Sequence, residues 1–304
     1  MKIIRPETVT DSIFQSSTVP EADEAEWLSG TTYHVDDLVM VTTTANGAAT
    51  ATHKIYSSVH SQAGNDPTVD DGTNWAEVSS TNRWKLFNAI VQEQTENAGG
   101  MEYVLQSPAV INSLALINVD TASVTVEVVD SVEGTVYDET FSLVSSSGIQ
   151  DWYAYFFEPI VRDDRLAILD LPPYANADIT VTFTDTGTAK CGALIIGQFA
   201  DLGFSQHGAN YSIIDYSVKA TDSQGRVTIT EGPYANKLDV DVVLNTSAFG
   251  VTRSTLTDLR TTPAVWVAEE DNRDSIVYGY YREFDIILSN PTTSRCSLEI
   301  EGLV

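Results

Sequence analysis

The sequence predicts an all-β protein, with a small aromatic-rich N-terminal β-module followed by one or two antiparallel, jelly-roll-like β-sandwich domains. Three of the five tryptophans lie between Trp27 and Phe87, interleaved with turn-forming residues. That pattern is typical of a very small module whose core must be built from aromatic rings. After residue 101, apolar and polar residues alternate with a period of two, and turn signals recur roughly every ten residues, as in a β-sandwich. Helical periodicity is almost absent.

The N-terminal region is expected to begin with an edge segment at residues 1–20, where Met1 to Arg5 form a short strand and Pro6 limits its pairing. Residues 33–41 predict a turn followed by a strand. A hairpin around Asn46-Gly47 leads to a return strand at residues 53–59. The segment from Arg83 to Phe87 brings the chain out of the module.

The polar stretch 88–100 predicts a boundary, so we expect a module at residues 1–88 and β domains at 101–200 and 201–304. The last two domains could also form one unit. One helix is expected, at residues 254–261, because Leu256 and Leu259 are spaced i, i+3. The main predicted strands cover residues 110–119, 123–130, 135–143, 152–157, 165–169, 179–183, 191–199, 212–218, 227–230, 238–244, 264–268, 278–281, 284–288 and 297–300.

The net charge of −27, from 43 acidic and 16 basic residues, argues against nucleic acid as a partner. Phosphate contacts need clustered Lys and Arg, and no basic block occurs. We interpret the scattered acids mainly as a device for solubility and against self-association; cation binding and repulsion from DNA are the alternatives.

The start of the chain has the acidic residue Glu7 shortly after Met1 and lacks the apolar stretch of a signal peptide. No run approaches the roughly 18 apolar residues of a membrane span. We therefore expect synthesis in a host cytoplasm and no membrane insertion. Cys191 and Cys296 both lie in apolar, strand-like surroundings. Two buried thiols are the first interpretation, and a disulfide between them is the alternative.

A search for catalytic, metal and cofactor motifs predicts none of the three. Ser205 and His207 have the wrong spacing for a nucleophile elbow and no evident third partner. His34, His53 and His60 could meet in the module, but structural histidines are the simpler interpretation. Acidic pairs such as Asp163-Asp164 and Asp36-Asp37 are expected by chance among so many acids.

The remaining candidate site is aromatic, with Trp27, Tyr33, Tyr56 and Trp75 as the ligand-binding candidates. Aromatic faces stack on the C–H faces of sugar rings, so these residues could form a glycan platform. A module of this size also needs the same rings as its core. Both interpretations stay open on the sequence.

The order of Trp27, Tyr33, Lys54-Ile55-Tyr56, Asp66-Pro67 and Trp75 resembles the small chitin- and cellulose-binding modules of bacterial chitinases. In this chain Asp36 replaces the glycine that precedes Asp37 in that family's pattern, and the loop at 42–52 is longer. The resemblance covers about fifty residues. It implies a sugar-binding fold for the module.

The wider arrangement is similar to tailed-bacteriophage virion proteins. Those proteins often start with a strand like Met1-Lys2-Ile3-Ile4-Arg5-Pro6 and leave such a module through a segment like Thr81-Asn82-Arg83-Trp84-Lys85-Leu86-Phe87. The similarity implies a non-enzymatic structural component of a phage tail, neck or fibre, located in the virion. Its partners would be other virion proteins and copies of itself, with host surface polysaccharide as a further candidate. The alternatives are a sugar-binding adhesin or receptor-binding protein and, third, a polysaccharide-degrading enzyme.

Overall fold

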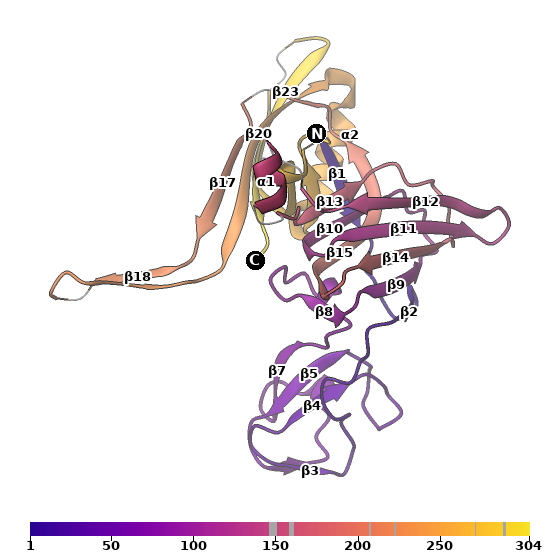
Figure 1. Cartoon of the computed structure of the whole chain (residues 1–304), viewed down its shortest axis with the longest axis vertical. Helices are drawn as coiled ribbons and strands as arrows, with labels where there is room; N and C mark the ends of the chain where they lie inside the picture. Colours follow the sequence, from indigo (N-terminus) through magenta and orange to yellow (C-terminus); the bar gives the residue numbers. More distant parts are fainter. Residues whose placement is uncertain (146–150, 158–160, 207, 222, 271, 288–289) are drawn as a thin grey trace.

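The computed structural model describes residues 1–145, 151–157, 161–206, 208–221, 223–270, 272–287 and 290–304. It confirms the all-β class: the strands form several antiparallel sheets (Figure 1). A small module hangs from a larger body, and a thin arm projects from the body's side. None of the helices among the described residues has the length and apolar character needed to cross a bilayer.

The module occupies residues 26–80 and contains two small sheets. Its core consists of aromatic and branched aliphatic side chains, as the spacing of the tryptophans predicts. The predicted antiparallel pairing of the two strands is confirmed, but residues 42–53 connect them as a long loop and not as a tight turn at Asn46-Gly47; Gly47 has a φ of 96° in this loop, which glycine adopts readily. The strands are β4 (Leu38–Val41), β5 (Lys54–Ser58) and β7 (Trp75–Ser80) in one sheet, and β3 (Thr32–Tyr33) with β6 (Gln62–Ala63) in the other, beside the 3₁₀ turn η1 (Pro67–Val69).

The body (residues 1–21 and 82–304) is built around two larger sheets, and Val19 and Leu86 belong to its main core. The five-stranded sheet has the order β12 (Gly134–Ser142), β11 (Ser123–Asp130), β14 (Asp178–Thr184), β9 (Met101–Gln106) and β2 (Phe14–Ser17). Along β9, β11 and β14 every second side chain is buried, which is the alternation that the sequence predicts.

The larger sheet has eleven strands among the described residues and runs through most of the body. Its order is β13 (Arg165–Ile168), β10 (Ser113–Asp120), β15 (Thr188–Asp201), β1 (Lys2–Pro6), β21 (Ala264–Val267), β22 (Ile276–Ile287), β23 (Thr293–Gly302), β20 (Tyr234–Asn245) and β16 (Phe204–Ser205), with β8 (Thr95–Ala98) on β15 and β17 (Asn210–Asp215) on β20. The helix α2 (Phe249–Asp258) and the 3₁₀ turns η3 (Thr246–Ala248), η4 (Leu259–Thr261) and η5 (Arg273–Ser275) lie in its connections.

Strand β1 corrects the expectation of an edge segment at the N-terminus. It is central, pairing with β15 on one side and β21 on the other, so it joins the regions 101–200 and 201–304 into one sheet. Ile3 and Ile4 are completely buried on its opposite faces. Residues 1–17 therefore belong to the body, although the sequence prediction assigned them to the module.

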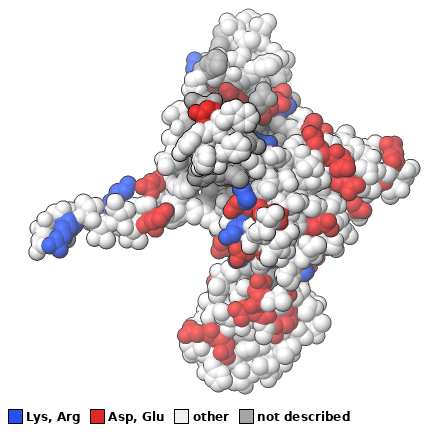
Figure 2. Space-filling model, viewed as in Figure 1, with Lys and Arg blue, Asp and Glu red and all other residues white. Residues whose placement is uncertain are grey.

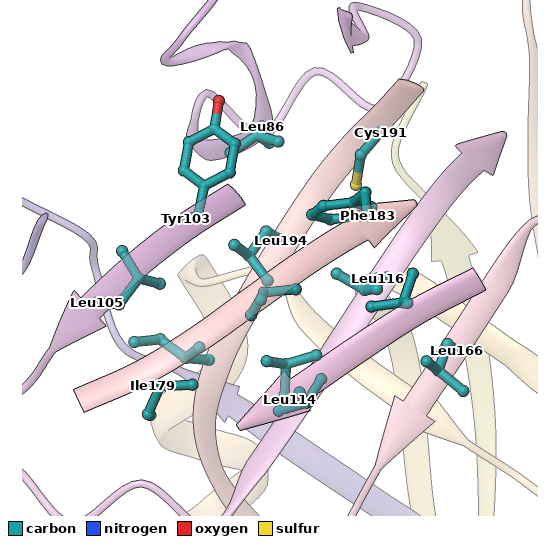
Figure 3. Close-up of a cluster of buried hydrophobic side chains, with 14 of the residues drawn as sticks. Leu86, Tyr103, Leu105, Leu114, Leu116, Leu166, Ile179, Phe183, Cys191 and Leu194 are labelled. Carbon is teal, nitrogen blue, oxygen red and sulfur yellow. The ribbon is translucent and has the colours of Figure 1, made fainter. Parts of the chain in front are cut away.

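The main core lies between the five-stranded sheet and the β13–β10–β15 part of the larger sheet (Figure 3). Figure 3 shows Leu105, Ile179 and Phe183 from the first sheet near Leu114, Leu116 and Leu194 from the second. Cys191 is buried in this core, and Cys296 in a separate cluster, each as a free thiol. The interpretation as two buried thiols is thus confirmed and the disulfide alternative is not.

The aromatic run at residues 152–157, which we predicted to be a strand, is instead the short helix α1 (Trp152–Phe157). The run has no polar residue at alternate positions, so a strand formed by it would lack a polar face for the solvent. Trp152 stacks on Phe156 and Tyr153 lies against Phe157, which are i, i+4 pairs of one helix face. All four of these rings are largely exposed. The predicted helix near 254–261 is present, divided between α2 and η4.

Candidate functional site: the groove between module and body

A groove of about 820 Å³ lies where the module meets the body. Body residues line it from the segment before β2 and from the turn η2 (Lys85–Phe87), and module residues line it from β5 and β7. Its wall mixes aromatic rings with charged and amide groups, among them Asp11, Lys54, Glu77, Trp84, Phe87 and Asn88.

His53 is the module residue at the centre of this junction. Its φ of 54° lies in the left-handed region that a non-glycine residue rarely adopts. Backbone hydrogen bonds on both sides hold it there: its amide donates to Val41 (2.9 Å) and its carbonyl accepts from Thr81 (2.9 Å). The unusual backbone aims the imidazole ring out of the module and toward the body, so the strain accompanies a specific contact.

The imidazole of His53 contacts three residues outside the module. Nδ1 lies 2.8 Å from Glu21 Oε1, and Nε2 lies 3.0 Å from Asp11 Oδ1. The ring also stacks on Trp84, with centroids 4.2 Å apart and an angle of 22° between the planes. Burial alone lowers the pKa of His53, but the hydrogen bond to Glu21 and the charges of Glu21 and Asp11 outweigh it and raise the pKa above 6.5. A protonated His53 would donate from both nitrogens and add a cation–π contact to Trp84.

Glu21 is the hydrogen-bond acceptor that three residues of the junction share. Its side chain is only 8% exposed and accepts hydrogen bonds from His53, from the Thr81 hydroxyl (2.7 Å) and from Arg83 Nη1 (3.3 Å). Burial by itself raises the pKa of Glu21, but the hydrogen bonds from His53 and Thr81 outweigh it and hold the pKa below 4.5. The carboxylate is therefore ionised at neutral pH, and both of its buried oxygens accept hydrogen bonds.

The exit segment Asn82-Arg83-Trp84 forms the other half of the junction. The Asn82 amide accepts from the Glu96 backbone N–H (3.0 Å) and donates to the Glu96 carbonyl (2.9 Å), so it mimics a neighbouring strand. Arg83 Nε donates to the Val19 carbonyl (2.7 Å). Tyr103 of the body donates its hydroxyl hydrogen to the Arg83 carbonyl (2.9 Å).

Trp84 links the groove to the main core. Its ring lies 5.2 Å from that of Phe14 and 5.6 Å from that of Phe87, and both of those rings also contact Tyr103. The next residue but one, Leu86, points into the main core beside Tyr103 (Figure 3). The exit segment is therefore a joint that fixes the module on the body through the stacked Trp84, the hydrogen-bonded Arg83 and the buried Leu86.

The four predicted glycan-binding rings lie elsewhere, inside the module. Trp27, Tyr33, Tyr56 and Trp75 are between 1% and 8% exposed and form one core cluster with Val39, Val41 and Ala48. Tyr33 and Trp75 pack edge to face at 5.1 Å. Trp75 Nε1 donates to the Asn65 carbonyl (2.9 Å), and the Tyr56 hydroxyl donates to Thr52 Oγ1 (3.1 Å). These rings have no exposed face for a sugar, so their burial favours the core interpretation.

The other candidates of the sequence are not brought together as a reactive centre. His53 bonds to Glu21 and Asp11, whereas His34 lies beside Asp37, and in the described part of the chain no three His, Cys, Asp or Glu residues form a metal-binding group. Asp163 pairs with Arg273 (2.6 Å). Ser205 donates to the Ala268 carbonyl (2.7 Å), and its proposed partner His207 lies outside the described residues.

Sequence reasoning missed Glu21 and Asp11 as junction residues. The signal that was available is the acidic approach from Glu21 to Glu26 directly before the module. An acid there is ordinary in so acidic a chain, and only the folded structure shows that it faces His53 and Arg83.

No protein-family model, curated protein or solved structure matches this chain.

Proposed function

We propose that this chain is a non-enzymatic structural subunit of a tailed-bacteriophage particle, in its tail, neck or fibre. The observation that carries the proposal is the distribution of exposed apolar side chains. Seven large ones lie on the arm (residues 210–234), and four aromatic ones lie on α1. Apolar groups gathered on such segments mark surfaces that other proteins cover.

The joint between module and body supports the same role. In this chain, the exit segment forms hydrogen bonds with Glu21, Val19, Glu96 and Tyr103. The residues on which the proposed resemblance rests therefore hold the module on the body. A rigidly mounted module suits a subunit that must hold its place in a large assembly.

The test is the location of the chain in purified particles. Particles induced from cells that carry the gene, purified by density gradient and digested for mass spectrometry, should contain the chain in several copies per particle. Antibodies against the module should label one defined part of the particle by electron microscopy. Particles that lack the chain, from cells in which it is expressed, would overturn the proposal.

Sugar binding is the second candidate function, and the groove at the junction is the observation that favours it. The groove offers Trp84 and Phe87 beside Lys54, Glu77 and Asn88, which is a combination of rings and polar groups that suits a saccharide. Lys54 and Glu77 pair at 2.8 Å, so both should be removed together to avoid leaving one charge alone.

A pull-down on host surface polysaccharide would separate the two functions. Binding by the full chain that the variant Lys54→Ala/Glu77→Ala loses would support the groove as a glycan site. Absence of binding at millimolar sugar would reject it. Release of oligosaccharides in the same incubation would instead favour the third alternative, a polysaccharide-degrading enzyme.

A further inference from the structure

We infer that the arm of one copy docks on the free edge of strand β12 in a second copy, so that subunits associate head to tail. The inference builds on the proposed structural role, since such contacts need many copies in one assembly. It names the partner of the arm, a second copy of this chain, and the strand that receives it.

The tip of the arm is a hairpin that its own chain leaves without a sheet. Strands β18 (Val218–Thr221) and β19 (Val227–Thr230) pair only with each other among the described residues, and all eight of their residues are exposed. A two-stranded hairpin alone is marginally stable in water. The tip lies beyond the part of β20 that is paired with β23, because that pairing begins only at Lys237. Figure 1 shows it reaching well away from the body.

The composition of this tip suits a sheet that one copy does not supply. Six of the eight strand residues are β-branched, the class that fits a pleated and half-buried surface. Cross-strand pairing puts Ile229 beside Lys219, and Val227 beside Thr221, on one face. Strands of this kind pair readily with an unpaired strand edge of another molecule.

Strand β12 offers such an edge. It is the last strand of the five-stranded sheet, none of its nine residues is buried, and within the described residues it pairs only with β11. Its length exceeds that of either arm strand, so it can receive the whole tip.

Charge selects the arm as the partner of β12. The hairpin 123–142, which contains β11 and β12, has five acids and no base. The tip 218–230 has two bases, Lys219 and Arg226, and one acid, in a chain whose net charge is −27; Lys219 also pairs with Asp215 of β17 (2.9 Å). Figure 2 shows basic side chains on the outer part of the arm, with acidic ones nearer the body, and a larger group of acidic side chains over the opposite side of the body.

The same charges disfavour the symmetric alternatives. Two β12 edges would bring Asp138 and Glu139 against the same acids of the other copy, and two arm tips would bring Lys219 and Arg226 together. Like charges across an interface disfavour the wrong pairing. Only the arm–β12 combination joins opposite charges.

The positions of the two elements then determine the kind of assembly. The arm and the β11–β12 hairpin project to opposite sides of the body (Figure 1). A copy that docks its arm on one neighbour keeps its own β12 edge free for another. Repeated head-to-tail contacts of this type generate a ring when the rotation closes and a helical filament when it does not.

Charge reversal on each side, alone and in combination, tests the inference. Lys219→Glu/Arg226→Glu reverses the arm, and Asp138→Lys/Glu139→Lys reverses the edge. Each variant alone should weaken self-association by about tenfold or more in sedimentation velocity, because close opposite charges become like charges. An equimolar mixture of the two variants should recover association, since each arm then meets an edge of opposite charge.

The control is Arg253→Glu/Arg260→Glu, which makes the same charge change at two exposed cations near α2. It should associate like the unaltered chain, and circular dichroism should show that all variants are folded. Equal loss in the control, or a mixture that stays dissociated, would overturn the inference.

A disulfide trap gives an independent readout. Chains with Thr228→Cys in the arm and chains with Thr140→Cys in β12 are mixed under mild oxidation. Burial raises the pKa of the native Cys191 thiol to about 12 and that of Cys296 to about 11, so neither competes. A disulfide between the two variants is expected; its absence, with the full chain monomeric at high concentration, would overturn the inference.

The two proposals fail separately in these experiments. A chain that occurs in particles but whose association ignores the arm and β12 reversals would retain the structural role and lose the arm contact. A chain that forms arm-dependent rings but is absent from particles would retain the contact and lose the virion role.

Discussion

The module and the arm use apolar residues in opposite ways. The module turns Trp27, Tyr33, Tyr56 and Trp75 inward and leaves their faces covered, whereas the arm leaves Val227 and Ile229 exposed on one strand of its terminal hairpin. The aromatic content of the module is a requirement of its small size. The exposed β-branched residues of the arm have no such explanation within one copy, and they therefore point to contact with another molecule.

The strongest test of this contrast is removal of a module ring. Trp75→Ala should destabilise the module by about 3–5 kcal/mol, because it deletes a fully buried ring from a small core. Thermal unfolding followed by near-UV circular dichroism would measure it. Val78→Ala, at an exposed position of the same strand, is the matched control and should have little effect. A Trp75→Ala chain as stable as the control would mean that the rings are not the core.

The joint between module and body should respond next most strongly. Glu21→Ala removes the common acceptor of His53, Thr81 and Arg83, and leaving such groups unpaired should cost about 1–3 kcal/mol. Limited proteolysis between module and body should accelerate in this variant. The control is Glu24→Ala, the same substitution three residues further along the chain, which the protease should cleave at the rate of the unaltered chain. Equal cleavage rates for the two variants would contradict the role of Glu21.

The contribution of the joint to the stability of the chain should also depend on pH in a specific direction. Glu21, with its lowered pKa, contributes stability above pH 4.5, and this is lost as pH falls through its folded-state pKa. His53, with its raised pKa, contributes stability below pH 6.5, and this is lost as pH rises through its folded-state pKa. The stability advantage of the unaltered chain over His53→Gln should therefore be greatest between pH 4.5 and 6.5 and shrink above that range. Urea midpoints across pH 4.5–9 would show it; a pH-independent difference would contradict the His53–Glu21 pairing.

The smallest effect on folding is expected at the arm. Val227→Thr/Ile229→Thr keeps the branched shape on exposed strands, so the free energy of unfolding of one copy should change by less than about 0.5 kcal/mol. Association of copies should nevertheless weaken in sedimentation experiments. The control Val240→Thr places a hydroxyl in a buried position of β20 and should cost about 1–3 kcal/mol. An arm variant as destabilised as this control would show that the arm is part of the fold of a single copy.

Most strands were predictable because period-two alternation is a local property of the chain. The strands at 123–130 and 227–230 lie where the alternation places them, and the module's ring cluster follows from its tryptophan spacing. The run at 152–157 misled because aromatic β-propensity without alternation fits a short helix equally well. The candidate site was less predictable: Trp84 was visible in the exit motif, but its stacking partner His53 is 31 residues away, and Glu21, which bonds to His53, is a further 32 residues from it.

By itself, the sequence determined the all-β class, the aromatic composition of the module, the apolar surroundings of the two cysteines and the large negative charge, since composition and alternation within a few residues are enough for each. Only the tertiary structure decided that β1 is central, that His53 joins module to body, and that the arm tip and the outer edge of β12 lie on opposite sides with no further strand partner among the described residues. The physical reason is that strand pairing and side-chain contacts link residues distant in the chain. A strand's own sequence sets which faces it can bury, whereas the folded arrangement sets which edges remain open.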